Sequence, residues 1–559
     1  MRHIAPISGI AAFGDNYVAT AGYDNQVILW HGPEKDPIQR VFHDHLANQC
    51  AFSRDGRHLA TASSDYTARL WDVPDMRLKA VFAGHEDDIE MVAFSPDGER
   101  LATCSRDHNV KVFDLAGNEL GHIAGHEADV ISVTWMPDGV QLVSSSDDGT
   151  VRRWDTRTLE EISRTSLEGV ETDTIAVAED GVVFAGDDEG RISVIRPDGV
   201  TATTAHEAGI KRLVYSADRR LLVSLSYDRR GQLWTWDGDT LQPWHTAELP
   251  DIVWPRSCAF FGDDSLVFGT FGSAYAIYDY RRAAWNLQGI ERSISLNAVL
   301  HAGDHVYTVG DAGVVAEDGQ EIRDLGTLCN FLVALGGHVL TGGQAGRLFD
   351  ARTGQVIHQH RSPLNCGAAF ERDGVEHVAI GSYTGEALIF RLTADGSVEH
   401  VTDIPVHENA IKGLAAGDGV LFSVCADYAA AFHRTDDFSL IARKEEAHDR
   451  IANGCVAVRP GVFASISRDL KLRLWDKGEP VEVDTPNRNS IKCVSASPDG
   501  RYLATGSYIG LVCIYDVEQG SWVKVTRPTA SGVSSMAPAS SPGSFLASSY
   551  DGNVYEVSA

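Results

Sequence analysis

The chain has 559 residues, of which 43% are hydrophobic and 23% charged, an ordinary globular composition with room for two large cores. Its formal net charge is −30 and no tract is rich in lysine or arginine, so we expect no nucleic-acid partner, because a phosphate backbone would be repelled. The apolar runs are only strand-length and the first residues lack a secretory-signal pattern, so we expect no membrane association.

Nine cysteines are spread singly along the chain, and no two have C-x-x-C spacing. Most fall in strand-like runs, such as LATCS around Cys104. This usage is typical of buried free thiols in a reducing compartment, and not of a disulfide framework or a zinc site. We therefore expect a cytoplasmic protein.

One pattern recurs from the amino terminus onward. Each copy has a histidine, an alternating strand, an Asp-Gly turn, a second strand, a tight turn ending in Asp, and a third strand that closes on an aromatic-Asp pair; clear copies start at His45, His85 and His126. With a period of about 40 residues, the tight-turn position recurs fourteen times: Asp24, Asp65, Asp107, Asp148, Glu189, Asp228, Gly272, Asp311, Ala345, Thr384, Asp427, Asp469, Ile509 and Asp551. The pattern predicts an all-β chain of fourteen four-stranded antiparallel blades.

With these motifs the chain resembles the WD40-repeat β-propeller family. The resemblance is strong in units one to six, twelve and thirteen, and rests on spacing and strand pattern in the others. It implies two seven-bladed propellers, since one ring holds four to eight blades. The tandem architecture is similar to that of actin-interacting two-propeller WD40 proteins.

The two ends of the chain favour an interleaved arrangement of the rings. The last unit supplies three strands, and residues 2–6 form a spare segment before the first unit. If that segment is the fourth strand of blade 14, residues 1–240 with 528–559 form the first propeller and residues 241–527 the second, and two free edges disappear. A sequential split into 1–285 and 286–559 is the alternative.

A set of His, Ser, Asp and Trp recurs in several blades and looks like a catalytic triad. An enzyme needs one nucleophile, whereas this set returns once per blade, so we predict no catalytic residue. The resemblance to WD40 proteins implies a buried structural network in which the Asp accepts a hydrogen bond from the His. Its predicted members are His45, Ser63, Asp65, Trp71, His126, Ser146, Asp148, Trp154, His206, Ser226, Asp228, Trp234, His448, Ser467, Asp469 and Trp475.

Histidine pairs with H-x-H spacing are the main candidates for a metal site. His43 with His45 and His358 with His360 could each share one face of a strand, but no third and fourth ligand has a suitable spacing. Phosphate-binding loops of the GxxxxGK[ST] type are absent from the sequence. We therefore predict no metal and no cofactor.

The residue before each tight-turn position points out of the ring face in WD40 proteins, and the resemblance implies the same here. Tyrosine and arginine, which are enriched at binding hot spots, often occupy this position. Under the interleaved closure, Tyr227, Tyr550 and Tyr23 would form a contiguous arc with Arg106 further round. In the second ring the equivalent candidates are Phe271, Tyr383, Arg468 and Tyr508.

These features favour a non-catalytic interaction scaffold or adaptor that binds proteins or peptides on the propeller faces. Arginine outnumbers lysine and the loops are short, which is typical of a prokaryotic chain and suits a sensor or adaptor in a bacterial signalling or defence system. One alternative is a metal-dependent propeller hydrolase or lactonase, although Glu171, Asn297, Asn330 and Asn365 make no convincing cluster at a ring axis. The other is an actin- or cytoskeleton-directed factor, which rests on architecture alone.

Overall fold

The computed structural model describes residues 1–476 and 479–559, and all regular structure in this part of the chain is β-strand. Its strands form thirteen four-stranded sheets and one three-stranded sheet, with every pair of neighbours antiparallel. The all-β prediction with fourteen blades is thus confirmed, except that the last blade has three strands. Over the same residues, no helix is long and apolar enough to span a membrane.

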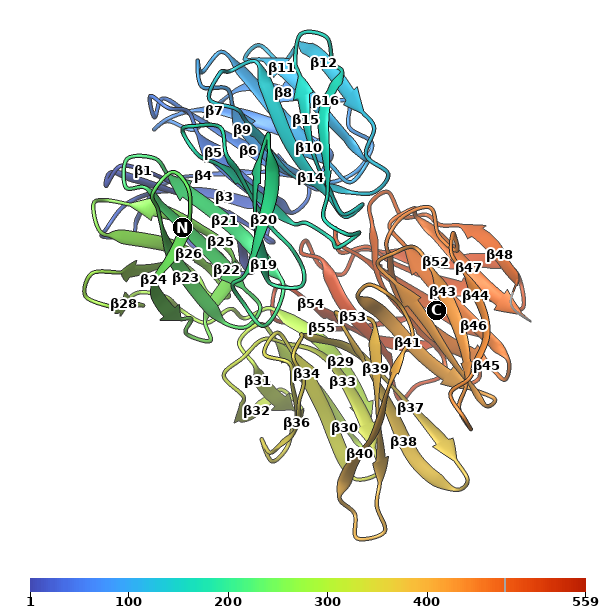
Figure 1. The fold of residues 1–559 in the computed structure, drawn as a ribbon. Helices are drawn as coiled ribbons and strands as arrows, with labels where there is room; N and C mark the ends of the chain where they lie inside the picture. Colours follow the sequence, from blue (N-terminus) through green and yellow to red (C-terminus); the bar gives the residue numbers. More distant parts are fainter. Residues whose placement is uncertain (477–478) are drawn as a thin grey trace. The chain divides into compact units, whose positions relative to one another are not determined.

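The chain divides into two compact units, Met1–Ser293 and Ile294–Ala559. Each unit holds seven sheets, which we number as blades 1–7 and 8–14 in chain order. In Figure 1 the strands of the first unit run from blue to green and those of the second from yellow-green to red.

The first unit contains the following strands. Blades 1 to 3 are β1 (Ile7–Phe13), β2 (Tyr17–Gly22), β3 (Gln26–His31), β4 (Asp36–Phe42); β5 (Ala47–Phe52), β6 (His58–Ser63), β7 (Ala68–Asp72), β8 (Arg77–Phe82); and β9 (Ile89–Phe94), β10 (Arg100–Ser105), β11 (Asn109–Asp114), β12 (Glu119–Ala124). Blades 4 and 5 are β13 (Val130–Trp135), β14 (Gln141–Ser146), β15 (Thr150–Asp155), β16 (Glu161–Ser166); and β17 (Thr174–Val177), β18 (Val183–Gly186), β19 (Arg191–Arg196), β20 (Gly199–Thr204). Blades 6 and 7 are β21 (Ile210–Ser216), β22 (Leu221–Ser226), β23 (Arg230–Trp236), β24 (Leu241–Glu248); and β25 (Val253–Phe261), β26 (Ser265–Thr270), β27 (Ala276–Asp279), β28 (Ala284–Asn286).

The second unit repeats the order. Blades 8 to 10 are β29 (Leu296–Ala302), β30 (His305–Gly310), β31 (Val314–Glu317), β32 (Gln320–Asp324); β33 (Cys329–Leu335), β34 (His338–Gly343), β35 (Arg347–Asp350), β36 (Val356–Gln359); and β37 (Leu364–Arg372), β38 (Val375–Ser382), β39 (Glu386–Leu392), β40 (Val398–Pro405). Blades 11 and 12 are β41 (Ile411–Gly417), β42 (Val420–Cys425), β43 (Ala430–Arg434), β44 (Leu440–Lys444); and β45 (Ala452–Arg459), β46 (Val462–Ser467), β47 (Lys471–Asp476), β48 (Glu479–Asp484). Blades 13 and 14 are β49 (Ile491–Ala496), β50 (Tyr502–Ser507), β51 (Val512–Asp516), β52 (Ser521–Thr526); and β53 (Val533–Pro538), β54 (Ser544–Ser549), β55 (Val554–Ser558).

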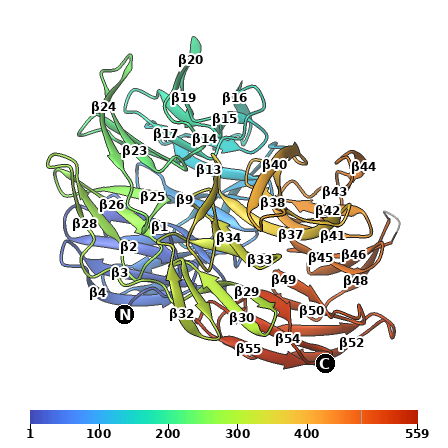
Figure 2. The ribbon, with the colours of Figure 1, turned by 90° about the horizontal axis from the view of Figure 1, so that it is seen from below.

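The innermost strands of each unit contact one another in a closed cycle. In the first unit β1, β5, β9, β13, β17, β21 and β25 follow in order, and β25 returns to β1. In the second unit β29, β33, β37, β41, β45, β49 and β53 do the same, and β53 returns to β29. Figure 2 shows β54 of blade 14 close to β29 of blade 8. Seven blades joined in a ring are the arrangement of a β-propeller.

The structure contradicts the interleaved closure. Blade 14 lies in the second unit, and its third strand β55 has no fourth partner among the described strands. Residues 1–6 form no strand and belong to the first unit, where His3 donates its backbone N–H to Ser273 O at 3.0 Å and contacts Asp24 through its ring. The boundary after Ser293 lies close to the sequential alternative, because the amino-terminal segment serves blade 1 and not blade 14.

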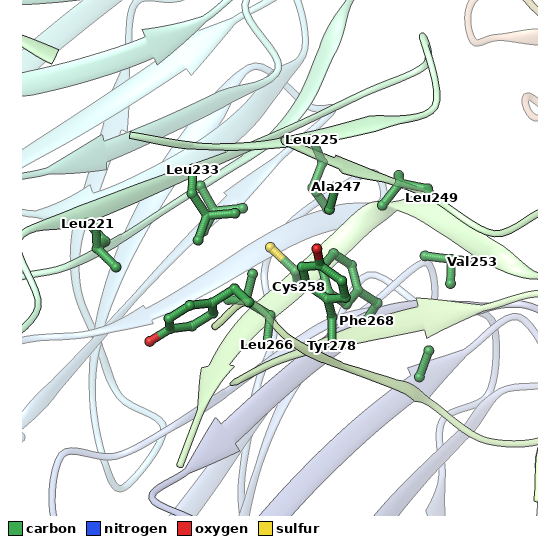
Figure 3. Close-up of a cluster of buried hydrophobic side chains, with 13 residues drawn as sticks. Leu221, Leu225, Leu233, Ala247, Leu249, Val253, Cys258, Leu266, Phe268 and Tyr278 are labelled. Carbon is green, nitrogen blue, oxygen red and sulfur yellow. The ribbon is translucent and has the colours of Figure 1, made fainter. Parts of the chain in front are cut away.

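The core of each unit lies between neighbouring blades. The cluster in Figure 3 joins blades 6 and 7, where Leu225 and Leu233 pack with Cys258, Phe268 and Tyr278. A second cluster closes the first ring, with blade 1 residues such as Trp30 against blade 7 residues such as Tyr275. Each sheet therefore buries both faces against its neighbours, which no blade could do alone.

Almost every innermost strand begins with a β-bulge. Thirteen of the fourteen pairings between first and second strands shift register near the start of the inner strand, the exception being β17. A bulge leaves one residue unpaired and turns its side chain in a new direction. Single bulged residues are Ser8, Asn48, Glu90, Ile131, Lys211, Asn297, Asn330, Asn365, Lys412, Asn453, Lys492 and Ser534.

The bulged asparagines link each blade to the next. Asn330 Nδ2 donates to Leu364 O at 2.9 Å, and Asn365 Nδ2 donates to Ile411 O at 2.8 Å. Asn297 makes the same contact with Cys329 O at 3.1 Å. These three asparagines, considered above as ligands at a ring axis, are thus occupied in hydrogen bonds between blades.

Candidate functional site

Beneath the tight turns of the first unit lies a buried network that orders this end of the blades. In blade 4, His126 lies with Nδ1 2.8 Å from Asp148 Oδ2 and Nε2 2.8 Å from Ser144 Oγ. The Trp154 indole donates to the same hydroxyl at 2.8 Å. With the carboxylate ionised, the Trp154 indole donates to the Ser144 hydroxyl, and this hydroxyl donates to His126 Nε2. The His126 Nδ1–H then donates to Asp148.

Four other blades of this unit repeat the contact between imidazole and carboxylate. The nearest distances from Nδ1 to the carboxylate are 3.0 Å for His3 and Asp24, 2.9 Å for His43 and Asp65, 2.7 Å for His85 and Asp107, and 2.9 Å for His206 and Asp228. The hydroxyls on the Nε2 side are Thr20, Thr61, Thr103 and Ser224. Blade 3 has Phe113 where the others have tryptophan.

Two parts of the predicted network are wrong. The histidine of blade 2 is His43, whereas His45 Nδ1 accepts from Leu46 N at 2.7 Å. The predicted serines lie two residues past the hydroxyl that bridges His and Trp; Ser63, for example, accepts from Asp65 N at 3.0 Å, and Ser146, Ser226 and Ser467 cap their turns in the same way. Because residues i and i+2 of a strand share one face, the alternation could not distinguish each predicted serine from the bridging hydroxyl two residues before it.

A signal in the sequence could have found the right histidine. The pairs with His43, His85, His126 and His206 are all separated by 22 residues from their aspartate. The remaining predicted members are placed as expected in blades 2, 4 and 6, where the tryptophans donate to the bridging hydroxyl. In blade 12, Trp475 does so as well, but Asp469 accepts from Arg473 and the His448 Nδ1 lies 3.3 Å from Tyr428 O.

The network lowers the pKa of its aspartates in blades 2, 3, 4 and 6. Burial alone would raise the pKa of Asp107, but the hydrogen bond and charge of His85 outweigh it and lower that pKa to about 2. Burial lowers the pKa of His43 and of His126. A neutral imidazole therefore donates to an ionised carboxylate, which is a strong charge-assisted hydrogen bond.

Above the network lies one surface of the first unit, which we call the bulge face. It is formed by the bulged beginnings of the inner strands and by the tight turns. It consists of the bulged or preceding residues Glu90, Asp129, Glu171, Asp173, Lys211, Trp254 and Arg256, and the turn residues Tyr23, Arg106, Asp147, Asp188, Tyr227 and Phe271. Both groups lie at the same end of each blade, because the start of the inner strand pairs with the end of the second strand. Closed rings hold such loops in place, so little ordering entropy is lost on binding.

Aromatic side chains gather on this face where blades 7 and 1 meet. The Tyr23 ring packs edge-on against Trp254 with 5.2 Å between centroids, and Trp254 packs on Phe271 at 5.4 Å. The Arg256 guanidinium lies 5.6 Å from the centroid of Trp254. This combination of aromatic rings with arginine is typical of the centre of a protein interface.

Carboxylates gather on the same face from blades 3 to 5. Arg106 donates to Glu90 and to Asp129 at 2.5 Å each. Arg256 of blade 7 reaches Glu90 of blade 3 at 3.3 Å, a contact between blades that are not neighbours in the ring. Lys211 contacts both Asp173 and Asp188 and lies over the Tyr227 ring, 5.1 Å from its centroid.

The carboxylates of blades 4 and 5 outnumber the cations beside them. Burial, and then the charges of Asp188 and Asp173, raise the pKa of Glu171 to about 8. Burial raises the pKa of Asp188 to about 6, against the opposing effect of Lys211. Burial and the charge of Glu171 also raise the pKa of Asp147. Carboxyl groups whose pKa values are raised by burial and by one another's charge favour an added positive charge nearby.

The predicted arc of Tyr227, Tyr550 and Tyr23 does not form, because its members belong to two different units. Tyr23, Arg106 and Tyr227 lie on the bulge face, but Tyr550 lies in the second unit, stacked on Tyr508 with 6.4 Å between centroids. Phe271 belongs to the first unit and is only 2% exposed, so it supports Trp254 from below. The missed residues Glu90 and Lys211 could have been found by counting back from the tight turn to the second residue of each inner strand.

Two tyrosine candidates of the second unit, Tyr383 and Tyr508, each have a lysine over the ring. Lys412 lies over the Tyr383 ring at 4.8 Å from its centroid, and Lys492 lies over Tyr508 at 5.9 Å. Arg468 is half-buried at the turn of blade 12. Whether any of these residues contacts a partner stays a prediction.

Comparison with known proteins finds the repeat in four segments. Residues 37–72, 76–114, 117–155 and 478–516 match the family described as "WD domain, G-beta repeat". The chain therefore contains WD40 repeats, and its fourteen sheets are consistent with about fourteen of them.

The curated relatives match only over short stretches. The guanine nucleotide-binding protein subunit beta of Schizosaccharomyces pombe is 34% identical over 74 residues, which are 13% of this chain and 24% of that protein. Protein HIR1 of Mycosarcoma maydis is 35% identical over 66 residues, 12% of this chain and 6% of that protein. Transducin beta-like protein 3 of Rattus norvegicus is 33% identical over 87 residues, 13% of this chain and 11% of that protein. The matched segment thus spans less than a quarter of each relative.

Removing one network carboxylate should weaken the fold without altering the bulge face. Asp148 accepts from His126, Arg152, Thr150 and the Glu127 backbone. We expect Asp148→Asn to lower the free energy of unfolding by about 1–3 kcal/mol, because several buried donors lose a charged acceptor. Thermal or urea unfolding measures this, with Glu160→Gln at an exposed position of the same blade as control. An equal stability in both variants would contradict the structural role.

The raised pKa of Glu171 makes the stability of the first unit depend on pH. Between its unfolded pKa near 4.3 and its folded pKa of about 8, the folded chain binds the extra proton, so the free energy of unfolding falls as pH rises. Glu171→Gln is neutral throughout and should remove this loss. We expect it to gain on the order of 1–3 kcal/mol over the wild type at pH 8 relative to pH 5. The exposed Glu168→Gln should show no such difference, and a gain independent of pH would refute the assignment.

Proposed function

We propose that this chain is a non-catalytic interaction scaffold whose first unit binds a protein or peptide partner on the bulge face. The observation that carries the proposal is the convergence on one propeller face of Tyr23, Trp254 and Arg256 with the acidic residues of blades 3 to 5. An aromatic platform beside an acidic region suits a partner segment that presents an arginine or lysine next to apolar side chains.

Several features support a binding role. WD40 repeats generally serve in protein interaction, and one matched relative is by its name a subunit of a guanine nucleotide-binding protein. The polar groups of the repeated His-Asp sets are engaged in hydrogen bonds within the blades, which is a structural use of residues that could otherwise suggest hydrolysis. The net charge of −30 also favours a basic partner.

We also propose, from its composition and short loops, that the scaffold acts as a sensor or adaptor in a bacterial signalling or defence system. The cysteines are all free and mostly buried, which supports a reducing compartment such as the cytoplasm. The identity of the partners recovered from the native cell tests this role. Signalling or defence proteins among them support it, and other partners would point to a different role.

Paired tyrosine variants test which face binds. Tyr23→Ala with Tyr227→Ala removes two half-buried rings from the bulge face, and Tyr508→Ala with Tyr550→Ala removes a half-buried pair from the second unit. We expect the first pair to lower partner recovery in affinity capture with quantitative mass spectrometry by at least about tenfold, the effect of losing interface hot spots. The second pair should leave recovery unchanged.

Circular dichroism and melting curves establish that both double variants are folded. Undiminished recovery by a folded Tyr23→Ala, Tyr227→Ala variant would overturn the proposed binding face, and an equal loss in both variants would show that the face is not selective.

A further inference from the structure

Blade 11 of the second unit keeps the histidine and the aspartate of the network but separates them. His407 Nδ1 lies 3.8 Å from Asp427 Oδ2, whereas the five blades described above have contacts of 2.7 to 3.0 Å. The His407 side chain is 0% exposed, and within the described part of the chain its Nδ1 has no hydrogen-bond partner. A buried ring nitrogen left in this state costs free energy unless something else binds it.

Cys425 lies close to both His407 and Asp427. Cys425 stands two residues before Asp427, at the position held by Ser63, Ser146, Ser226 and Ser467 in other blades. Its Sγ is buried and donates to Asn409 O at 3.2 Å. One imidazole nitrogen, one sulfur and one carboxylate oxygen, from His407, Cys425 and Asp427, all lie within 4.8 Å of one another.

We propose that His407 Nδ1, Cys425 Sγ and the Asp427 carboxylate bind a Zn²⁺ ion. Zinc accepts imidazole, thiolate and carboxylate ligands at about 2.0–2.3 Å, and four-coordinate sites need atoms that surround one point at this spacing. The sulfur and nitrogen ligands exclude the hard cations Ca²⁺ and Mg²⁺, which prefer oxygen. Binding replaces the thiol proton with the metal and releases that proton to solvent, and a water molecule completes the tetrahedron.

The surrounding hydrogen bonds fit a metal on Nδ1. His407 Nε2 lies 2.9 Å from Ser423 Oγ, and that hydroxyl lies 3.3 Å from Ala431 O. With the metal on Nδ1, Nε2–H donates to Ser423, which in turn donates to the carbonyl. His433 takes the place of the network tryptophan, ten residues after Ser423, so no indole competes for this hydroxyl. Such an outer contact fixes the tautomer and orientation of a metal-binding histidine.

The charges around the site also balance. Arg443 Nη2 lies 3.3 Å from Asp427 Oδ2, and its Nε donates to Glu445 at 2.8 Å. The thiolate, Asp427 and Glu445 carry as much negative charge as the ion and Arg443 carry positive charge. Asp427 is 22% exposed, which leaves a path for the ion and for water from the surface.

Cobalt substitution of the full-length protein tests the site directly. The purified chain is stripped with a chelator under reducing conditions and titrated with Co²⁺. We expect one equivalent to give thiolate-to-cobalt charge-transfer absorption and the intense visible bands of four-coordinate cobalt, and one equivalent of Zn²⁺ to abolish both. Metal analysis after reconstitution should then show one zinc per chain.

Matched cysteine variants locate the ligand. Cys425→Ser restores the residue that other blades carry, so it should fold normally and lose the charge-transfer band and the zinc-dependent rise in melting temperature. Cys493→Ser lies in the inner strand β49, where Sγ donates to the backbone carbonyls of Gly506 at 3.9 Å and Val533 at 3.8 Å, and it should retain both. No cobalt–thiolate band in the wild type, or a band that survives Cys425→Ser, would overturn the site. Asp427→Asn offers a second ligand variant, expected to weaken zinc binding while leaving the thiolate band at higher cobalt concentration.

Discussion

The hydrogen bond between a buried imidazole and a buried carboxylate is the contact on which the ordered end of five blades of the first unit depends. In blade 4 it ties the loop that enters the blade, through His126, to the turn between the second and third strands, through Asp148. A carboxylate in this position must be satisfied, since burying it without donors costs several kcal/mol. The bulged beginning of the inner strand and the tight turn are consequently held side by side. The side chains above them therefore have fixed positions.

The two units use this contact differently. In the first unit five blades keep it, and the bulge face above them collects aromatic, acidic and basic side chains whose places are set by rigid backbone. In the second unit the contact is opened at His407, whose Nδ1 has no hydrogen-bond partner in the described part of the chain, and at His448, whose Nδ1 lies 3.3 Å from Tyr428 O. We therefore propose that the network supports partner binding where it is intact and metal binding where a cysteine lies beside it.

Much of this fold follows from periodicity, and the failures have identifiable physical causes. The 40-residue repeat predicted fourteen sheets because a tight turn between two strands returns at this regular spacing along the chain. The choice of His45 over His43 failed because both histidines lie in the loop between β4 and β5, and only the 22-residue spacing to the aspartate distinguishes them. The interleaved closure failed because it considered only unpaired strand edges, whereas the His3 side chain ties the amino-terminal segment to Asp24. A bulge adds one unpaired residue that simple alternation does not reveal, so Glu90 and Lys211 were missed, although a count back from the tight turn to the second residue of each inner strand would have found them.

The most direct test of the account is hydroxyl-radical footprinting of the full-length chain, alone and bound to a partner recovered from its native cell. The account predicts protection concentrated at Tyr23 and Tyr227, with unchanged reactivity at exposed side chains of outer strands such as Leu78 and Leu120. Protection confined to the outer strands or to the second unit, with Tyr23 and Tyr227 as reactive in the complex as in the free chain, would contradict it.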